Sequence, residues 1–236
     1  IQGVLDTATR YAVESVETTR KSSRPFAPFI TSSLKVSASN VLGFATDRTM
    51  RIAQMLYQGI NVSGEGLVGL ITYMRTDSTH LSADAIALAR DYVSERHGKN
   101  YLPDKPRFYG SSNKDAQAAH EAIRPTDPRR TPQQLAPSLN AEHLKLYRLI
   151  SNRFVACQMT DAQWDSTAVK FRRSDRDTGA VLKASGRVLA FDGWTRVGGI
   201  AASDEQVLPS FEKGDQTTPF AIDPRQKFSS PPARYN

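Results

Sequence analysis

The sequence has 236 residues, 39% of them hydrophobic and 23% charged, which permits one large globular domain or two small ones. It holds no apolar run long enough to cross a bilayer, no signal-peptide pattern at Ile1, and a single cysteine, Cys157. This argues against a membrane protein and excludes an internal disulfide framework, and it fits a reducing cytoplasm. Lys and Arg number 31 against 24 Asp and Glu; the net charge of +7 favours a polyanionic partner, with nucleic acid first, although simple solubility also explains it.

The first predicted element is a strand over residues 11–17, where hydrophobic and polar residues alternate. Residues 18–28 contain positive charges, hydroxyl groups and two prolines. This composition predicts a linker, and with it the first domain boundary.

The centre of the chain is predicted to be helical because apolar residues recur at intervals of three and four. Gly43 and Gly59 stand where two of these helices should end. Ser82 and Asn140 are expected as N-caps where helices begin, and Thr46 or Asp47 is expected as the N-cap of another helix. The predicted helices cover residues 31–42, 46–58, 82–98, 113–123 and a longer stretch after Asn140.

Between the second and third of these helices lies a glycine-rich stretch, Asn61–Gly69. Its Gly64-x-Gly66-x-x-Gly69 spacing matches the dinucleotide-binding fingerprint. That fingerprint needs a strand before it and a helix after it. Here a helix precedes, and the apolar, β-branched run of residues 67–74 follows, so the stretch is interpreted as a flexible loop leading into a strand.

Beyond Met159 the pattern changes to that of strands. Alternation around Val169 predicts one strand, residues 181–184 and 188–191 predict two short ones separated by Ser185-Gly186, and a last strand is expected near 217–222. Trp164 and Trp194 are expected in the β core, and residues 228–235 look like an exit linker.

These elements predict an α+β multidomain fold. A mainly β domain would be built from both chain ends, residues 1–24 plus 160–232, with a mainly α domain of residues 25–159 inserted in it and residues 233–236 beginning a further domain. The two crossings between these domains, near Arg24 and Met159, would lie side by side and form a natural hinge.

The most informative stretch is Leu70–Ser78, an apolar run that ends on Tyr73. A phenol, whose ordinary pKa is about 10, is a weak nucleophile and needs a nearby cation or base. Arg75 shares a strand face with Tyr73, and its guanidinium suits a phosphate oxygen. The alternative is a half-buried core tyrosine followed by a surface arginine. Asp77 would either cap a turn together with Ser78 or orient Arg75.

A second polar cluster follows at residues 119–125, in the predicted short helix. If Tyr73 acts on a phosphate, His120 is the best candidate in this sequence for a second phosphate contact; otherwise it is structural or merely exposed. No His, Cys or carboxylate partners stand at metal-ligand spacing, so no metal site is predicted in this chain.

At Ile71–Ser78 the sequence resembles the bacterial type IA DNA topoisomerases, and Met74 between Tyr73 and Arg75 favours the topoisomerase I branch. Further stretches resemble the same family in the same order, so that the resemblance covers the chain from about Tyr11 to its last residue. They are Pro28–Leu34, Arg48–Gln54, Ala119–Pro125 and Pro231–Tyr235.

The resemblance implies that Tyr73 is the catalytic tyrosine, which forms a transient 5′-phosphotyrosyl link with one DNA strand while a second strand passes. It implies that Arg75 binds the scissile phosphate and that Arg75, His120 and Arg124 contact DNA. The activity implied is ATP-independent relaxation of negatively supercoiled DNA through a single-stranded segment, in the nucleoid region of the cytoplasm. The β part would be the arch and hinge, and the helical part the gate.

The family's Toprim domain, which holds Mg²⁺ and a glutamate for proton transfer, has no counterpart in these residues. The chain, which lacks an initiator Met, is therefore expected to be a central fragment that works with the remaining domains of the same polypeptide and is inactive alone. The alternative function is a non-catalytic module that binds single-stranded DNA. Exposure of Tyr73 in a cleft with Arg75 and His120 would favour the enzyme over the binding module.

Overall fold

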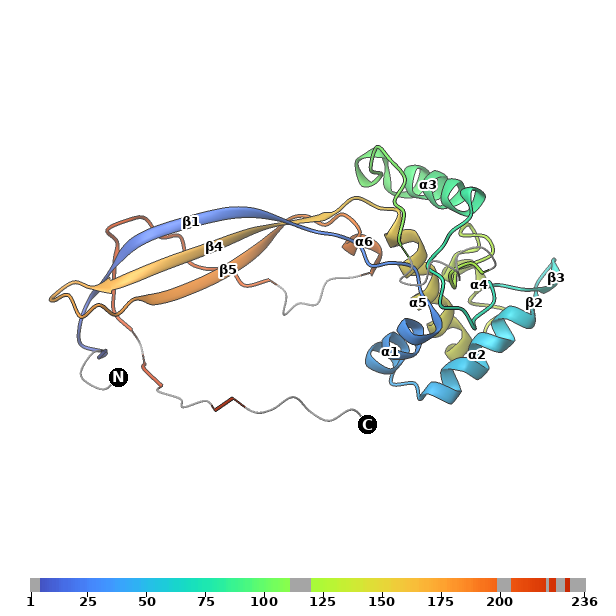
Figure 1. Ribbon diagram of the computed structural model, residues 1–236, viewed down its shortest axis with the longest axis horizontal. Helices are drawn as coiled ribbons and strands as arrows, with labels where there is room; N and C mark the ends of the chain where they lie inside the picture. Colours follow the sequence, from blue (N-terminus) through green and yellow to red (C-terminus); the bar gives the residue numbers. More distant parts are fainter. Residues whose placement is uncertain (1–4, 111–119, 199–204, 220, 224–227, 230–236) are drawn as a thin grey trace. The chain divides into compact units, whose positions relative to one another are not determined.

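The structure is a computed structural model that describes residues 5–110, 120–198, 205–219, 221–223 and 228–229 (Figure 1). It contains both α-helices and antiparallel strand pairs, which confirms the predicted α+β class. Within those residues, no helix combines the length and the apolar character needed to span a bilayer.

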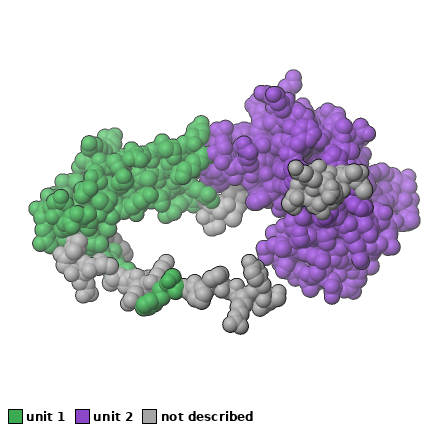
Figure 2. Space-filling view, in the orientation of Figure 1, with its two compact units in different colours: residues 1–21, 165–188, 203–236 green, residues 22–164, 189–202 purple. Residues whose placement is uncertain are grey.

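The chain forms two compact units, which Figure 2 colours separately. The first is Ile1–Lys21, Asp165–Val188 and Ser203–Asn236, and the second is Ser22–Trp164 and Leu189–Ala202. The predicted β domain of residues 160–232 had included the segment that follows Val188. That segment instead packs with the helical unit, because Trp194 lies on a buried cluster of Val93, Val155 and Met159.

The sheet of the first unit has four strands in the order β5-β4-β1-β6. Figure 1 labels the three long strands, β1, β4 and β5. The strands are β1 (Tyr11–Ser23), β4 (Ala162–Arg173), β5 (Leu182–Phe191) and β6 (Gln216–Thr217). β6 pairs antiparallel with β1, with Tyr11 opposite Thr217. Alternate residues of β1 and β4 point into one core, where Tyr11, Val13, Val169 and Phe171 are buried.

The first strand is longer than predicted, because residues 18–23 continue it instead of forming a linker. Pairing with β4 explains the difference. The hydroxyl groups of Thr18 and Thr167 lie 3.0 Å apart, and the Arg20 guanidinium makes two hydrogen bonds of 2.8 Å with the Asp165 carboxylate. These polar residues therefore form cross-strand pairs on exposed positions.

The two short strands predicted around Ser185-Gly186 are one continuous strand, β5. Gly186 does not break it. A Cβ atom there would lie 2.4 Å from the carbonyl oxygen of Gln206, so the glycine permits a second segment to approach the strand. The last strand, expected near 217–222, is only the two residues of β6. Residues 230–236, with the predicted start of a further domain, lie outside the described residues.

The second unit is built around α5 (Ala141–Cys157), which packs against the other long helices (Figure 1). Those helices are α1 (Thr31–Leu42), α2 (Thr46–Gln58) and α3 (Ala83–His97), and the short elements are a 3₁₀ turn η1 (Lys99–Tyr101), α4 (Pro132–Leu135) and α6 (Thr195–Gly198). Leu34, Leu56, Leu146 and Ile150 are fully buried in the main core.

Most predicted helix ends are confirmed. Gly43 ends α1 in the left-handed region at φ 67°, the Ser82 hydroxyl accepts the Ala85 N–H at 3.3 Å, and the Asn140 side chain accepts the His143 N–H at 2.8 Å. α2 begins at Thr46, within the predicted range, but its N-cap is Ala45 rather than Thr46 or Asp47, and no side chain caps it.

The glycine-rich stretch is a β-hairpin rather than a flexible loop. Its strands are β2 (Ile60–Val62) and β3 (Gly66–Val68). Gly64 and Gly66 have φ of 82° and 78°, which suits a tight turn. The Glu65 carboxylate at the tip forms an ion pair of 2.7 Å with Arg130, which holds the hairpin against the segment before α4. The next helix, α3, begins only at Ala83, so no helix opens directly after the glycines, as the dinucleotide-binding fingerprint would require.

Candidate functional site

Tyr73 does not lie in a regular strand: between β3 and α3 no residue belongs to a strand, and Ile71 forms an isolated β-bridge. Burial alternates along the segment that follows. Met74, Thr76 and Ser78 are buried, whereas Tyr73, Arg75 and Asp77 are exposed. Tyr73 retains 43% of its surface, so it is not a core residue.

The structure brings the two polar clusters of the sequence together. The Thr72 N–H donates to the Arg124 carbonyl at 2.9 Å, and the Thr72 hydroxyl donates to the Ala122 carbonyl at 2.7 Å while it accepts the Arg124 N–H at 3.0 Å. Ile71 and Pro125 form a β-bridge beside these bonds. The residue before Tyr73 is thereby fixed to a segment about fifty positions later in the chain.

The first turn of α1 holds the other side of Tyr73. The Thr31 N–H donates to the Thr76 carbonyl at 2.9 Å. The Thr31 hydroxyl accepts the Thr76 N–H at 2.9 Å and lies 2.8 Å from the Met74 carbonyl, to which it can donate its proton. Two threonine hydroxyls, those of Thr31 and Thr72, therefore hold the backbone on either side of Tyr73-Met74-Arg75.

These two threonines position the candidate site, and neither was given a role from the sequence. Thr31 stands in the stretch Pro28–Leu34, which the resemblance singled out without giving it a role. A hydroxyl-rich helix start was the available signal. It predicts local capping, however, and cannot show that the hydroxyl bonds a segment more than forty residues away.

The ring of Tyr73 contacts one other aromatic side chain, Tyr57, at the end of α2. The two ring centroids lie 5.3 Å apart with the planes inclined at 64°, and Tyr57 is itself 40% exposed. This edge-to-face contact favours one direction of the Tyr73 ring while the residue stays 43% exposed.

Arg75 is exposed and forms no ion pair or side-chain hydrogen bond with any residue that the structure describes. Its five N–H donors are available to an anion. The proposed bond from Asp77 to Arg75 is absent. The turn interpretation is confirmed for Ser78, whose hydroxyl accepts the His80 N–H at 3.1 Å.

The short helix predicted over residues 113–123 is wrong for its described part. Residues 113–119 lie outside the description, and residues 120–123 are extended, ending in a β-bridge between Ile123 and Phe29. Pairing with neighbouring backbone, including the Ala122 N–H bond to the His80 carbonyl at 2.8 Å, outweighs the local helix preference. His120 is exposed and makes no hydrogen bond within the described residues.

Arg124 differs from Arg75 because its guanidinium is already bonded. Its side chain is 13% exposed, donates to the Glu121 carboxylate at 2.6 Å and to the Pro125 carbonyl at 3.0 Å, and leaves a buried Nε without a partner. The Glu121 carboxylate also accepts the Ser82 N–H at 2.8 Å. Burial acts to raise the pKa of Glu121, but these bonds from Ser82 and Arg124 lower it overall.

The described residues contain no group of three His, Cys, Asp or Glu side chains that could hold a metal ion. Cys157 is fully buried, and burial raises its pKa to about 12, so it is not a reactive thiol. The chemistry available at this place is thus that of a positioned phenol with a free guanidinium two residues later.

The chain as a whole is similar to known proteins. A family model described as DNA topoisomerase matches residues 2–236. The chain is 46% identical over 227 residues to DNA topoisomerase 1 of Vibrio cholerae, covering 96% of this chain and 24% of that protein. It is 45% identical over 229 residues to DNA topoisomerase 1 of Escherichia coli, covering 96% of this chain and 25% of that protein.

A solved structure is also similar. Full-length topoisomerase I from Thermotoga maritima matches with a TM-score of 0.75 and 35% identity, over 89% of this chain and 33% of that one. The chain therefore spans about a quarter to a third of the length of these relatives.

Proposed function

The chain belongs to the DNA topoisomerase family, and we propose that it is the part of a type IA topoisomerase that bears the attacking tyrosine, Tyr73. The observation that carries the proposal is the exposed Tyr73 on a segment held by Thr31 and Thr72. Two residues later stands Arg75, which is exposed and has no partner among the described residues. A buried tyrosine at position 73 or a paired arginine at position 75 would contradict the proposal.

In the proposed reaction the phenol oxygen of Tyr73 attacks the phosphorus of one DNA strand. A bond forms between that oxygen and phosphorus, and the bond from phosphorus to the 3′ oxygen breaks, which leaves a 5′-phosphotyrosine and a 3′ hydroxyl. The phenol gives up its proton and the 3′ oxygen takes one up. One phosphodiester replaces another, so resealing is the reverse attack and needs no ATP.

The residues around Tyr73 have separate parts in this proposal. Arg75 donates to the scissile phosphate and stabilises the charge that develops on its oxygens. His120, exposed at the end of the segment that Thr72 holds, is a second DNA contact. For Arg124, the ion pair with Glu121 and the burial of the guanidinium, including its unpartnered Nε, argue for a part in supporting the segment rather than in contacting DNA directly.

The wider function is proposed for the full-length enzyme. The helical unit is the gate that carries Tyr73, and the sheet unit is the arch and hinge. A second strand of negatively supercoiled DNA passes while a single-stranded segment is cut, and the remaining domains of the polypeptide complete the site. The proposed place of action is the nucleoid region of the cytoplasm.

Among the described residues, no three His, Cys, Asp or Glu side chains lie together in a way that could hold a metal ion. Mg²⁺ and the residue that transfers the phenol proton are proposed to belong to a Toprim domain of the full-length enzyme. The 236-residue chain alone is accordingly expected not to relax supercoiled plasmid.

The test uses the full-length enzyme that contains this chain and a labelled single-stranded oligonucleotide. Tyr73→Phe is expected to abolish the covalent adduct seen after denaturation, while Tyr57→Phe, which changes the neighbouring half-exposed tyrosine, is expected to retain it. An adduct that survives in Tyr73→Phe contradicts the assignment. If the unmodified protein and both variants bound the oligonucleotide but none formed the adduct, the protein would instead be the single-strand-binding module.

A further inference from the structure

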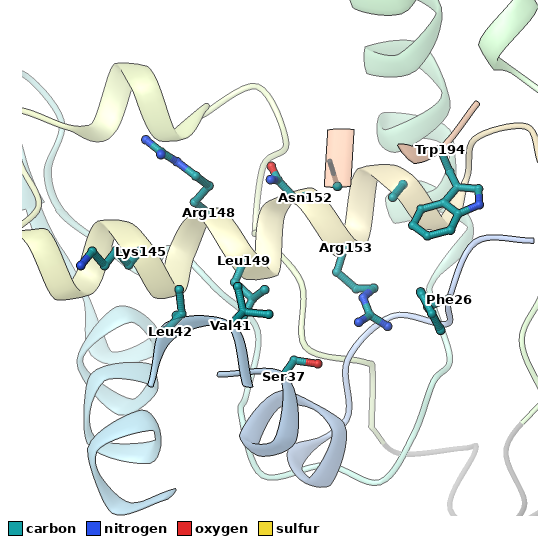
Figure 3. A pocket seen from close by; sticks show the side chains of 12 residues that line it. Phe26, Ser37, Val41, Leu42, Lys145, Arg148, Leu149, Asn152, Arg153 and Trp194 are labelled. Carbon is teal, nitrogen blue, oxygen red and sulfur yellow. The ribbon is translucent and has the colours of Figure 1, made fainter. Parts of the chain in front are cut away.

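A groove runs along α5 in the helical unit, at residues with no part in the site of Tyr73 (Figure 3). Its volume is about 510 Å³. Residues of α5 at positions 145, 148, 149, 152, 153 and 156 line it, and a recurrence at three and four residues places them on one side of the helix. The C-terminal half of α1, through Ser37, Val41 and Leu42, forms the facing wall.

Three cations face this groove: Lys145, Arg148 and Arg153. No carboxylate stands among its described lining residues, and within the described chain none of the three cations forms an ion pair. Figure 3 shows Lys145 and Arg148 toward one end of the groove and Arg153 near the middle. The groove is therefore positively charged over most of its length.

The other end of the groove is aromatic. Phe26 is 60% exposed although it is a large apolar side chain, and its ring packs edge-on against Trp194 with the centroids 5.5 Å apart. The Arg153 guanidinium lies 4.8 Å from the centre of the Phe26 ring and 4.3 Å from that of Phe29. These contacts hold Phe26 in place while most of its surface stays open.

We infer that this groove binds a segment of single-stranded DNA, with Lys145 and Arg148 on its phosphates and a base stacked on Phe26. Cations along a groove combined with a fixed, open aromatic ring are the features of sequence-tolerant single-strand binding. The exposed Val41, at 68%, and Leu149 offer apolar contact to the sugar and base edges. A small anion would not use this apolar surface, and an apolar peptide would leave the cations unpaired.

The inference rests on the proposed function only in making DNA the ligand. It does not need Tyr73 to be the nucleophile. It adds a second contact for single-stranded DNA on the same unit, built from α1, α5 and Phe26, none of which touches the scissile phosphate in the proposed reaction.

The experiment measures binding of fluorescein-labelled oligo(dT) to the 236-residue chain by anisotropy as salt is varied. The double variant Lys145→Ala/Arg148→Ala is expected to bind about tenfold more weakly at low salt, with a log–log salt slope shallower by about 1.4, since each single-strand phosphate contact contributes about 0.7. The matched control, Lys99→Ala/Lys105→Ala, removes two exposed cations outside the groove and is expected to keep both the affinity and most of the slope.

A second arm tests the stacking. In a Trp164→Phe background, Trp194 is the one remaining tryptophan, and oligo(dT) is expected to quench its fluorescence. Phe26→Leu keeps an apolar side chain but removes the ring, and is expected to lower the affinity about fivefold or more and weaken the quenching. Because Phe26 is 60% exposed, this change should leave the fold intact.

Equal affinity of the groove variant and its control, with Trp194 fluorescence unchanged by oligo(dT), overturns the inference and leaves the groove to a protein partner. The two proposals fail separately. If the groove variant binds oligo(dT) as tightly as its control while Tyr73 still forms the adduct, only the DNA-binding role of the groove is refuted. Weakened binding in the groove variant, together with an adduct that survives Tyr73→Phe, refutes only the assignment of Tyr73.

Discussion

The hydroxyl oxygen of Thr31 lies 2.8 Å from the carbonyl oxygen of Met74, the residue between Tyr73 and Arg75. The two residues are 43 positions apart in the chain. The same hydroxyl accepts the Thr76 N–H, so one side chain at the start of α1 satisfies two backbone groups of the segment that presents the phenol and the guanidinium. The placement of Tyr73 thus depends on α1 as much as on its own neighbours.

Thr31→Val should separate positioning from binding. Valine has nearly the shape of threonine but leaves the Met74 carbonyl and the Thr76 N–H without their partner, which should cost about 1–3 kcal/mol of unfolding free energy. In the full-length enzyme, the rate of adduct formation should fall at least about tenfold while the affinity for the oligonucleotide stays unchanged. Thr31→Ser, which keeps the hydroxyl, should restore the rate, and failure of this rescue would argue for a merely structural methyl contact.

Arg75→Ala should slow cleavage through loss of a charge-assisted contact to the phosphate. The expected loss is a few kcal/mol at most, or about a hundredfold in the cleavage rate, with weaker oligonucleotide binding. Folding should be unaffected, because the Arg75 side chain is exposed and unpaired among the described residues. Arg51→Ala on the exposed face of α2 is the matched control, and an equal effect of both substitutions would reduce Arg75 to a general surface charge.

The helices of the second unit were predictable because each carries its own signals. Ser82, Asn140 and Gly43 act within one turn of the helix that they end or begin, and the apolar periodicity of α1 and α3 selects the buried face. The nearness of Tyr73 and Arg75 also follows from their spacing. Their presentation at the surface, however, depends on hydrogen bonds between distant parts of the chain, such as those of Thr31 and Thr72.

The failures of the sequence reading share that cause. Residues 120–123 have a helical composition but extend because the carbonyl groups of Phe29 and His80 and the hydroxyl group of Thr72 bond their backbone. Residues 18–23 resemble a linker but pair with β4. Arg124 resembles a surface cation but is largely buried against Glu121. In each case tertiary hydrogen bonds outweigh a local preference, and periodicity contains no information about them.

Glu121→Gln should reveal the ion pair with Arg124 through its pH dependence. The pKa of Glu121 lies below its usual value of 4.5, so the stabilisation is fully present above that value and is lost as the pH falls through the folded-state pKa. The substitution should cost about 1–2 kcal/mol near neutral pH. The difference from the unmodified chain should shrink as urea unfolding is repeated down to about pH 4 and below.

The control for Glu121→Gln is Glu95→Gln, an exposed carboxylate on α3. Its unfolding free energy should differ little from that of the unmodified chain at every pH. If the two substitutions gave the same flat difference, the carboxylate of Glu121 would not be stabilising the segment beside Thr72.

Gly69→Ala should disturb the site from the side of Tyr57. A Cβ atom at Gly69 would lie 2.9 Å from the Tyr57 carbonyl oxygen, a backbone atom that cannot rotate away. The segment after β3 must therefore shift away from the end of α2, and with it the edge-to-face contact of Tyr73 and Tyr57. We expect a loss of about 1–3 kcal/mol in unfolding free energy and slower adduct formation in the full-length enzyme.

Gly110→Ala is the matched control for Gly69→Ala, since a Cβ atom at Gly110 meets nothing within 4 Å. Full adduct formation in Gly69→Ala would mean that the position of the phenol does not depend on Tyr57, and that Thr31 and Thr72 suffice to hold it.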